Sequence, residues 1–113
     1  MVACLFCKMV AGELPVTPIY EDDLSLSFFD ISPQAPFHAL IIPKIHYESV
    51  VSMADNPSLS GHLVSVCTKI AKQHHLTDSG FRIITNIGQD GGQSVYHVHF
   101  HLLGGRSMSW PPG

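Results

Sequence analysis

Three histidines alternate with apolar residues near the end of the chain, and this alternation constrains the fold more than any other feature. Residues 95–103 read Val-Tyr-His-Val-His-Phe-His-Leu-Leu. Side chains on a strand point to opposite faces in turn, so His97, His99 and His101 would share one face at spacings of about 7 Å. The core face would carry four other side chains: Tyr96, Val98, Phe100 and Leu102. We therefore expect a strand over residues 95–103 with one apolar face and one row of imidazoles.

The other apolar patterns predict two helices and four further strands. A short helix is expected over residues 4–11, and a second helix runs from Pro57 to about residue 75, with Asn56 as its N-cap. The strands are expected at residues 19–21, 24–29, 37–42 and 81–85. In the second of these strands, apolar residues alternate with serines, which is typical of a half-buried strand. Because the strands are grouped rather than alternating with helices, we expect an α+β fold with a five-stranded antiparallel sheet and two helices.

Composition narrows the class of protein. A length of 113 residues suits one domain, expected over residues 1–113, and 45% hydrophobic residues are enough for one packed core. The net charge of −3 and the six Lys and Arg residues, which form no basic cluster, argue against a nucleic-acid partner. No apolar stretch is long enough to span a bilayer, and the first residues lack the pattern of a signal peptide. We therefore expect a cytoplasmic protein without a membrane partner.

The row of histidines is compatible with two kinds of chemistry. Alternate imidazoles can bind a metal such as zinc, or one imidazole can act as a nucleophile while its neighbours position it and transfer protons. The loop before the strand favours the second kind. Gly88, Gly91 and Gly92 leave the backbone free to direct N–H groups at an anion, and Ser94 adds a hydroxyl donor. A phosphate site beside the histidines fits attack on phosphorus.

Cys4 and Cys7 form a Cys-x-x-Cys pair in the expected N-terminal helix. In a reducing compartment such a pair indicates metal binding or redox chemistry rather than a structural disulfide. The alternative is a pair of helix thiols that face a core. Cys67 is expected to be plain core. Three further histidines near the long helix are expected at the surface: His62, His74 and His75.

Four separate motifs resemble the histidine-triad (HIT) superfamily, and within it the histidine-triad nucleotide-binding (Hint) branch. Residues 97–103 are similar to the family signature, in which three histidines alternate with hydrophobic residues and two hydrophobic residues follow. The other motifs are Asp-Ile-Ser-Pro-Gln-Ala-Pro at residues 30–36, Gly-Gly-Gln-Ser-Val-Tyr at residues 91–96 and Trp-Pro-Pro-Gly at residues 110–113. Together they cover essentially the whole chain in the family's order.

This resemblance implies a HIT-like fold in a homodimer whose two sheets join into one ten-stranded sheet. It also implies a purine nucleoside phosphoramidase, which binds purine nucleoside monophosphates and hydrolyses the P–N bond of adenosine 5′-phosphoramidates. The middle histidine of the triad, here His99, would attack phosphorus and form a nucleotidyl-histidine intermediate. No cofactor is needed for that chemistry.

The resemblance also implies roles for individual residues. His97 and His101 would orient the nucleophile and relay protons, and His38 would complete a four-histidine arrangement. Asp30 would accept hydrogen bonds from the ribose hydroxyls, and the base pocket would be lined by Phe6, Leu14, Ile31 and Leu40. The phosphate or leaving group would be contacted by Ser94 and Asn86, with Gln93 and the Gly92 backbone nearby. Trp110 would lie near the partner subunit's site.

Each of these residues also has an ordinary structural role open to it. Asp30 could cap the turn that follows it. Phe6 and Leu40 could be core residues, and Trp110 could pack in a dimer. Asn86 and Gln93 could satisfy backbone groups within their loop.

The Cys-x-x-Cys pair occurs in a mostly bacterial subset of the family, where the resemblance implies a structural zinc site. Its ligands here would be Cys4, Cys7, His46 and His97. Thiolate and imidazole ligands together suit tetrahedral zinc. As a zinc ligand, His97 would anchor the triad rather than carry protons.

The sequence leaves three other functions open. One is a dinucleoside polyphosphate hydrolase or nucleotidyl transferase, as in other branches of the superfamily. Another is a nucleotide-binding protein with vestigial activity, and the last is a catalytic zinc site made by the triad itself. The serine at residue 94 and the C-terminal tail favour the phosphoramidase.

Overall fold

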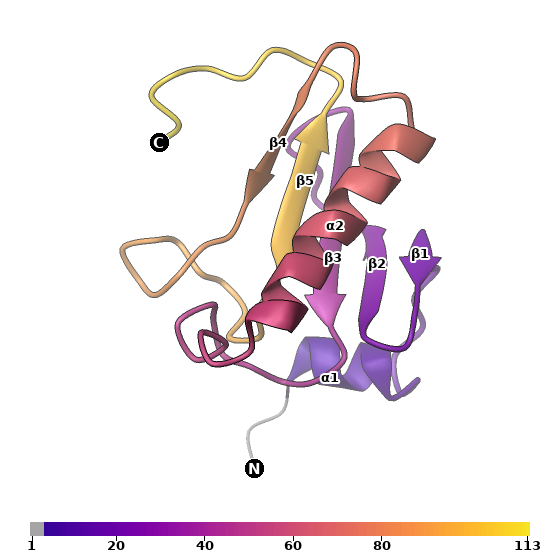
Figure 1. Cartoon of the computed structure of the whole chain (residues 1–113), viewed down its shortest axis with the longest axis vertical. Helices are drawn as coiled ribbons and strands as arrows, with labels where there is room; N and C mark the ends of the chain where they lie inside the picture. The colour runs from indigo at the N-terminus through magenta and orange to yellow at the C-terminus, as the bar shows by residue number, and fades with distance from the viewer. Residues whose placement is uncertain (1–3) are drawn as a thin grey trace.

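One antiparallel sheet organises the chain, with its five strands in the order β1-β2-β3-β5-β4 (Figure 1). The computed structural model describes residues 4–113. The strands are β1 (Tyr20–Glu21), β2 (Ser25–Phe29), β3 (Phe37–Pro43), β4 (Phe81–Ile84) and β5 (Phe100–Gly104). The helices are α1 (Leu5–Val10) and α2 (Pro57–Gln73). The predicted α+β fold with five antiparallel strands and two helices is confirmed.

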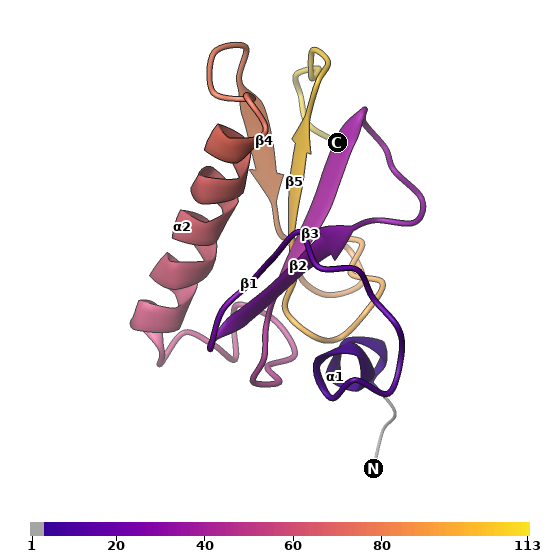
Figure 2. The same ribbon diagram turned by 90° about the vertical axis from the view of Figure 1, so that its right-hand side faces the viewer.

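The two helices lie on opposite faces of the sheet (Figure 2). α2 begins as predicted, because the side chain of Asn56 accepts a hydrogen bond from the Leu59 N–H (3.3 Å) and Pro57 occupies the first turn. The side chains that α2 buries in the larger core include Leu59, Leu63, Val66, Cys67 and Ile70. On the other face, α1 contributes Phe6 to a smaller core with Leu26, Phe28, Leu40 and Ile42. The sheet therefore has one closed face under α2 and one face that α1 covers only in part.

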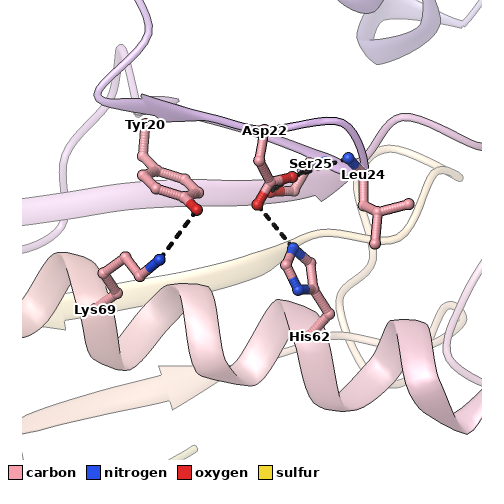
Figure 3. A network of polar contacts seen from close by, with 6 residues as sticks. All are labelled: Tyr20, Asp22, Leu24, Ser25, His62 and Lys69. Atoms are coloured by element: carbon pink, nitrogen blue, oxygen red, sulfur yellow. Dashed lines mark hydrogen bonds and ion pairs between the residues drawn. The ribbon is translucent and has the colours of Figure 1, made fainter.

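A set of polar contacts, which we call the hairpin–helix network, ties the β1–β2 hairpin to α2 (Figure 3). The network consists of Tyr20, Asp22, Ser25, His62 and Lys69. Asp22 Oδ1 accepts hydrogen bonds from two backbone N–H groups of the hairpin turn, at 2.9 and 2.7 Å, and its Oδ2 lies 2.7 Å from His62 Nε2. Lys69 Nζ donates to the Tyr20 hydroxyl at 3.3 Å. His62 is half-buried in this network rather than the plain surface residue that we expected.

The prediction of a half-buried second strand is wrong, because both faces of β2 are covered. Ser25 and Ser27 are 0% exposed. They lie on the α2 side of the strand, opposite to Leu26 and Phe28, which pack on the α1 side. The small serine side chains fit under the helix, a tertiary effect that the alternating pattern alone does not reveal.

The last strand begins at Phe100, five residues later than predicted. In the register of β3 with β5, Ile41 faces Phe100, so the chain before Phe100 would continue opposite the end of β3, where Pro43 has no N–H to donate. The backbone instead leaves the ladder, and the Val98 N–H donates to the carbonyl of Tyr47 at 2.8 Å. Of the expected core-face residues, Val98 is buried as predicted, whereas Tyr96 is 52% exposed.

The longest helix, α2, has 17 residues. No helix within residues 4–113 is long and apolar enough to cross a membrane. Cys67 lies in the core as predicted, and burial raises the pKa of its thiol to about 12.

Candidate active site

A pocket of about 700 Å³ opens beside α1 on the partly covered face of the sheet. Its walls come from α1, the segment that follows α1, the end of β2, and residues on β3 and β5. Seven of the expected site residues line it: Phe6, Asp30, Ile31, Leu40, Ser94, His99 and His101. Residues from distant parts of the sequence therefore meet around one cavity.

His99 is buried and lines this pocket. Its Nδ1 lies 2.8 Å from the carbonyl oxygen of His97. A carbonyl oxygen only accepts hydrogen bonds, so Nδ1 carries the proton, and a neutral His99 keeps its lone pair on Nε2. The ring of Phe6 contacts the imidazole edge-on, with 5.2 Å between centroids, and restrains its orientation. The site thus presents Nε2 of His99 as a nucleophilic atom.

His38 and His101 form a relay with a defined direction. The backbone N–H of Gln34 donates to His38 Nδ1 at 3.0 Å, so His38 carries its proton on Nε2. His38 Nε2 lies 2.9 Å from His101 Nδ1 and donates to it, which leaves the proton of a neutral His101 on its own Nε2. The ring of His101 lies 5.0 Å from that of His99 between centroids. The pocket therefore holds a lone pair on one imidazole beside an N–H donor on the next.

Burial keeps both relay histidines uncharged near pH 7. It lowers the pKa of His38, although the carboxylate of Asp30 opposes the shift. Burial and then the neighbouring charges of His99 and His38 lower the pKa of His101 to about 4. Both imidazoles are therefore neutral hydrogen-bonding groups before a ligand binds.

His97 is fully buried, but it is not one of the side chains that line the pocket. The ring of His97 lies on the same side as that of His99, because both contact Phe6 edge-on, but His97 joins a second cluster. Its Nδ1 lies 3.4 Å from Cys4 Sγ, 3.5 Å from Cys7 Sγ and 3.1 Å from His46 Nδ1. Cys7 Sγ also lies 3.3 Å from His46 Nδ1. We call these four residues, Cys4, Cys7, His46 and His97, the Cys/His cluster.

The donor atoms of the Cys/His cluster fit a tetrahedral zinc ion. Bonds of about 2.3 Å to sulfur and 2.0–2.1 Å to nitrogen would separate a sulfur from a nitrogen by about 3.6 Å and two nitrogens by about 3.4 Å. The four ligand atoms lie within 4.8 Å of one another, and the closest pairs match those edges within a few tenths of an ångström. His97 Nε2 donates to the Pro43 carbonyl at 2.9 Å, so Nδ1 is the nitrogen with the free lone pair, as metal-binding histidines require. This cluster can hold a metal ion.

The triad itself does not converge on a metal site in the described residues. His97 points its lone pair at the Cys/His cluster, away from His99 and His101. A second group of possible ligands, Asp30, His38 and His101, also lies within 4.8 Å, but His38 and His101 already share a direct hydrogen bond. Of the two kinds of chemistry, the geometry favours a nucleophilic imidazole with neighbouring imidazoles that position it. It does not favour a catalytic zinc site made by the triad.

The remaining expected contacts lie outside the pocket walls of this chain: Leu14, Asn86, Gly92, Gln93 and Trp110. Asn86 Nδ2 donates to the Gly91 carbonyl at 2.7 Å, and the Gln93 amide donates to the Glu48 and Val95 carbonyls at 2.6 and 3.1 Å. The N–H groups of Gly92 and Gln93 donate to carbonyls within the same loop. These groups hold the loop together, which is the ordinary role left open for Asn86 and Gln93. Trp110 is 82% exposed.

Sequence reasoning missed several residues that line the pocket. They include Val16, Thr17, Pro18 and Ile19, together with Phe29 and His74. His74 caps the C-terminus of α2, and its ring packs on Phe37 at 4.8 Å between centroids. No local motif marks these residues, because they meet only where the short β1 leaves the end of β2 uncovered.

Nearly the whole chain is similar to known proteins. A 14 kDa zinc-binding protein of Zea mays is 47% identical, over 96% of this chain and 87% of its own length. Adenylylsulfatase HINT1 of Arabidopsis thaliana is 46% identical, over 96% of this chain and 76% of its own. Purine nucleoside phosphoramidase of Escherichia coli is 45% identical, over 92% of this chain and 88% of its own.

Solved structures agree with these relatives. The crystal structure of a HIT family hydrolase from Legionella pneumophila superimposes with a TM-score of 0.95 at 46% identity, covering 98% of this chain and 100% of that one. The HIT domain family matches residues 11–108. The chain therefore belongs to the HIT domain family.

Proposed function

We propose that the chain hydrolyses the P–N bond of purine nucleoside 5′-phosphoramidates through a nucleotidyl-histidine formed on His99. The hydrogen bond from His99 Nδ1 to the His97 carbonyl carries this proposal, because it leaves Nε2 as a nucleophile in a pocket that also holds His101 and Ser94. Relatives named as a phosphoramidase and as an adenylylsulfatase support a hydrolase that acts on nucleotide-like substrates.

In the first step, Nε2 of His99 attacks phosphorus, the P–N bond breaks and the amine leaves. The amine needs a proton. A negatively charged phosphoryl group next to His101 favours the protonated form of that imidazole, so the bound substrate itself prepares His101 to supply the proton. Protonation of His101 at Nδ1 replaces the hydrogen bond that His38 Nε2 donates to the neutral ring.

In the second step, water attacks the same phosphorus and the bond from phosphorus to Nε2 breaks. His101, neutral after the first step, accepts a proton from the water. The nucleoside monophosphate is released and His99 regains its lone pair. Neither step requires a metal ion.

The other pocket residues bind the nucleotide in this proposal. Asp30 Oδ1 already accepts the Ser32 N–H at 2.8 Å, and its remaining lone pairs accept the ribose hydroxyls. Phe6, Ile31 and Leu40 hold the purine, and Ser94 hydrogen-bonds the phosphate. Ile31 is 99% exposed, so a bound base would cover a large apolar side chain that otherwise faces water.

The Cys/His cluster would hold zinc through the Sγ atoms of Cys4 and Cys7 and the Nδ1 atoms of His46 and His97. When bound, zinc would supply structural cross-linking between α1 and the segments around residues 46 and 97. The zinc-binding name of the Zea mays relative supports this assignment.

We also propose that two chains form a homodimer. β4 is the longer of the two edge strands of the sheet, and pairing it with a second copy would give the ten-stranded sheet that the family resemblance implies. Trp110, exposed in the single chain, would then lie near the partner's site.

A substrate panel tests the proposed reaction. The protein is offered an adenosine 5′-phosphoramidate, adenylyl sulfate and a diadenosine polyphosphate, with and without a chelator. We expect turnover of the phosphoramidate with the highest kcat/KM, and full activity in the presence of chelator as long as the Cys/His cluster retains its zinc. Preference for the polyphosphate would indicate the dinucleotide hydrolase instead. Tight AMP binding without turnover of any substrate would indicate a nucleotide-binding protein.

A further inference from the structure

We infer that the Cys/His cluster positions the nucleophile, so that metal bound there sets the rate of histidine attack without contributing to nucleotide binding. This inference rests on the proposed function for its kinetic part. It makes His97 and His46 positioning residues that act through His99 and do not touch the substrate.

The segment that contains His97 and His99 is not hydrogen-bonded as a strand of the sheet. β5 begins at Phe100, so His97 and His99 stand on backbone outside the ladder. Two contacts secure the chain there: the Val98 N–H donates to the Tyr47 carbonyl at 2.8 Å, and the Thr85 hydroxyl donates to the His99 carbonyl at 3.0 Å. The position of the His97 carbonyl therefore depends strongly on what holds His97 itself.

His97 links the Cys/His cluster directly to the nucleophile. Its ring is held at both nitrogens, by the Pro43 carbonyl at Nε2 and by the cluster at Nδ1, and its own carbonyl accepts the His99 Nδ1–H at 2.8 Å. A rotation of the His97 peptide would remove the acceptor that fixes the His99 tautomer. The proton of His99 could then move to Nε2, and Nε2 would lose the lone pair that attacks phosphorus.

His46 strengthens the same link from the other side. It precedes Tyr47, whose carbonyl accepts the Val98 N–H, so the residues that follow the two histidine ligands are hydrogen-bonded to each other. A metal ion bound to both imidazoles would lock this pair of segments as a unit. Without the ion, the cluster has thiol–imidazole contacts of 3.3 to 3.5 Å and an imidazole–imidazole contact of 3.1 Å, and His46 is exposed to solvent.

The test compares zinc-loaded protein, zinc-stripped protein and the His46→Ala variant, with zinc content measured by elemental mass spectrometry. We expect zinc loss to lower kcat by about 10–100-fold, because small displacements of a reacting group have effects of that size. KM and the Kd for AMP should stay within about twofold, since the lost interaction acts on attack and not on binding. If His46→Ala keeps its zinc, the Cys7→Ser/His46→Ala double variant takes its place.

Imidazole NMR gives a readout that does not depend on turnover. The zinc-loaded protein should show a protected Nδ1–H resonance for His99, and the resonance should broaden or vanish when zinc is lost. His46→Cys restores a four-ligand set of a kind found in structural zinc sites and should recover zinc, kcat and the resonance together. If the wild type fails to hydrolyse phosphoramidates, the proposed function is wrong, yet the resonance still tests the positioning.

His62→Ala is the matched control, because it weakens the hairpin–helix network on the other face of the sheet (Figure 3). It should lower stability while kcat and the His99 resonance remain unchanged. Zinc loss with unchanged kcat and an unchanged resonance would overturn the inference. Equal losses in the His62→Ala control would also overturn it, because they would show a general loss of stability.

Discussion

The two faces of the sheet hold their histidines in different ways. On one face, His62 of α2 is paired with a carboxylate, Asp22, at 2.7 Å. On the pocket face, main-chain groups fix one ring nitrogen each of His99 and His38, namely the His97 carbonyl and the Gln34 N–H, although Asp30 Oδ2 also lies 3.6 Å from His38 Nε2. A carboxylate holds an imidazole through one ring N–H, whereas a carbonyl or an N–H group placed against one ring nitrogen fixes which tautomer a neutral ring adopts.

Because of this difference, we expect the histidine of the hairpin–helix network to affect stability and the histidines of the pocket to affect the reaction. The hairpin–helix network connects two elements and leaves its histidine without a role in the pocket. The pocket face fixes which nitrogen of each imidazole has a lone pair and which carries a proton. We therefore expect substitutions on the two faces to give distinct signatures, with lost turnover on one and lost stability on the other.

His99→Ala should give the largest effect. We expect kcat to fall by about 10³-fold or more, because the attacking atom is lost, while AMP binding and the melting temperature change little. Steady-state kinetics and calorimetry on the same preparation measure both. A variant that keeps a tenth of the wild-type kcat would show that another group attacks phosphorus.

His101→Gln should give the next largest effect on turnover, about 10²-fold in kcat, because the proton donor to the amine is lost. A phosphoramidate with a strongly acidic leaving group needs less protonation and should be affected less. Equal losses for both kinds of leaving group would argue against proton transfer by His101.

His101 should also make stability depend on pH. Its pKa is about 4 in the folded protein and about 6.5 when unfolded, so the unfolded state binds the extra proton first as the pH falls. Stability should therefore decline between pH 6.5 and pH 4, with His101 contributing at most about 1.4 kcal/mol per pH unit. Urea unfolding across this range should show a shallower slope for His101→Gln than for wild type.

Asp22→Asn should affect stability and leave turnover unchanged. Burial acts to raise the pKa of Asp22, but hydrogen bonds from the Leu24 N–H, His62 and Ser25 outweigh it and hold the pKa well below its usual range. The variant should lose about 1–2 kcal/mol at pH 7, a typical cost for hydrogen bonds to a charged group. Because the folded pKa is depressed, this contribution is present above about pH 4 and is lost as the pH falls further.

The pH dependence of stability tests whether the charge of Asp22 is responsible for this effect. The stability difference between Asp22→Asn and wild type should shrink below about pH 4 as the carboxyl group is protonated. A difference that stays constant down to pH 2 would show that the charge of Asp22 is not what ties the hairpin to α2.

Ser27→Ala should give the smallest effect. The Ser27 hydroxyl is buried and has no hydrogen-bond partner among residues 4–113. Removing it relieves the cost of an unpaired polar group, so we expect a change between zero and a gain of about 1 kcal/mol. A clear loss on chemical denaturation would mean that the hydroxyl has a partner in solution, such as a bound water molecule.

Much of the fold could be predicted from local patterns. Asn56 and Pro57 mark the start of α2 correctly, and the central strand follows from its run of large apolar residues up to Pro43. The positions of His99 and His101 in the site also follow from the alternating motif. Each of these predictions uses residues that are close together in the sequence, so the sequence alone is sufficient to make it.

The features that the sequence did not predict depend on contacts between residues that are far apart in the chain. The start of β5 at Phe100 depends on Pro43 facing the preceding segment, and the burial of Ser25 and Ser27 depends on α2 lying over them. His74 reaches the pocket because a helix ends beside an uncovered strand. The spacing of residues along the chain does not predict any of these three contacts.

The stereochemical course at phosphorus tests the central claim most directly. A P-chiral adenosine 5′-phosphorothioamidate is hydrolysed in ¹⁸O-labelled water and the configuration of the product is determined. Attack by His99 followed by attack of water gives two inversions, so we expect overall retention. Inversion would mean that water attacks phosphorus directly, and it would contradict the nucleotidyl-histidine intermediate.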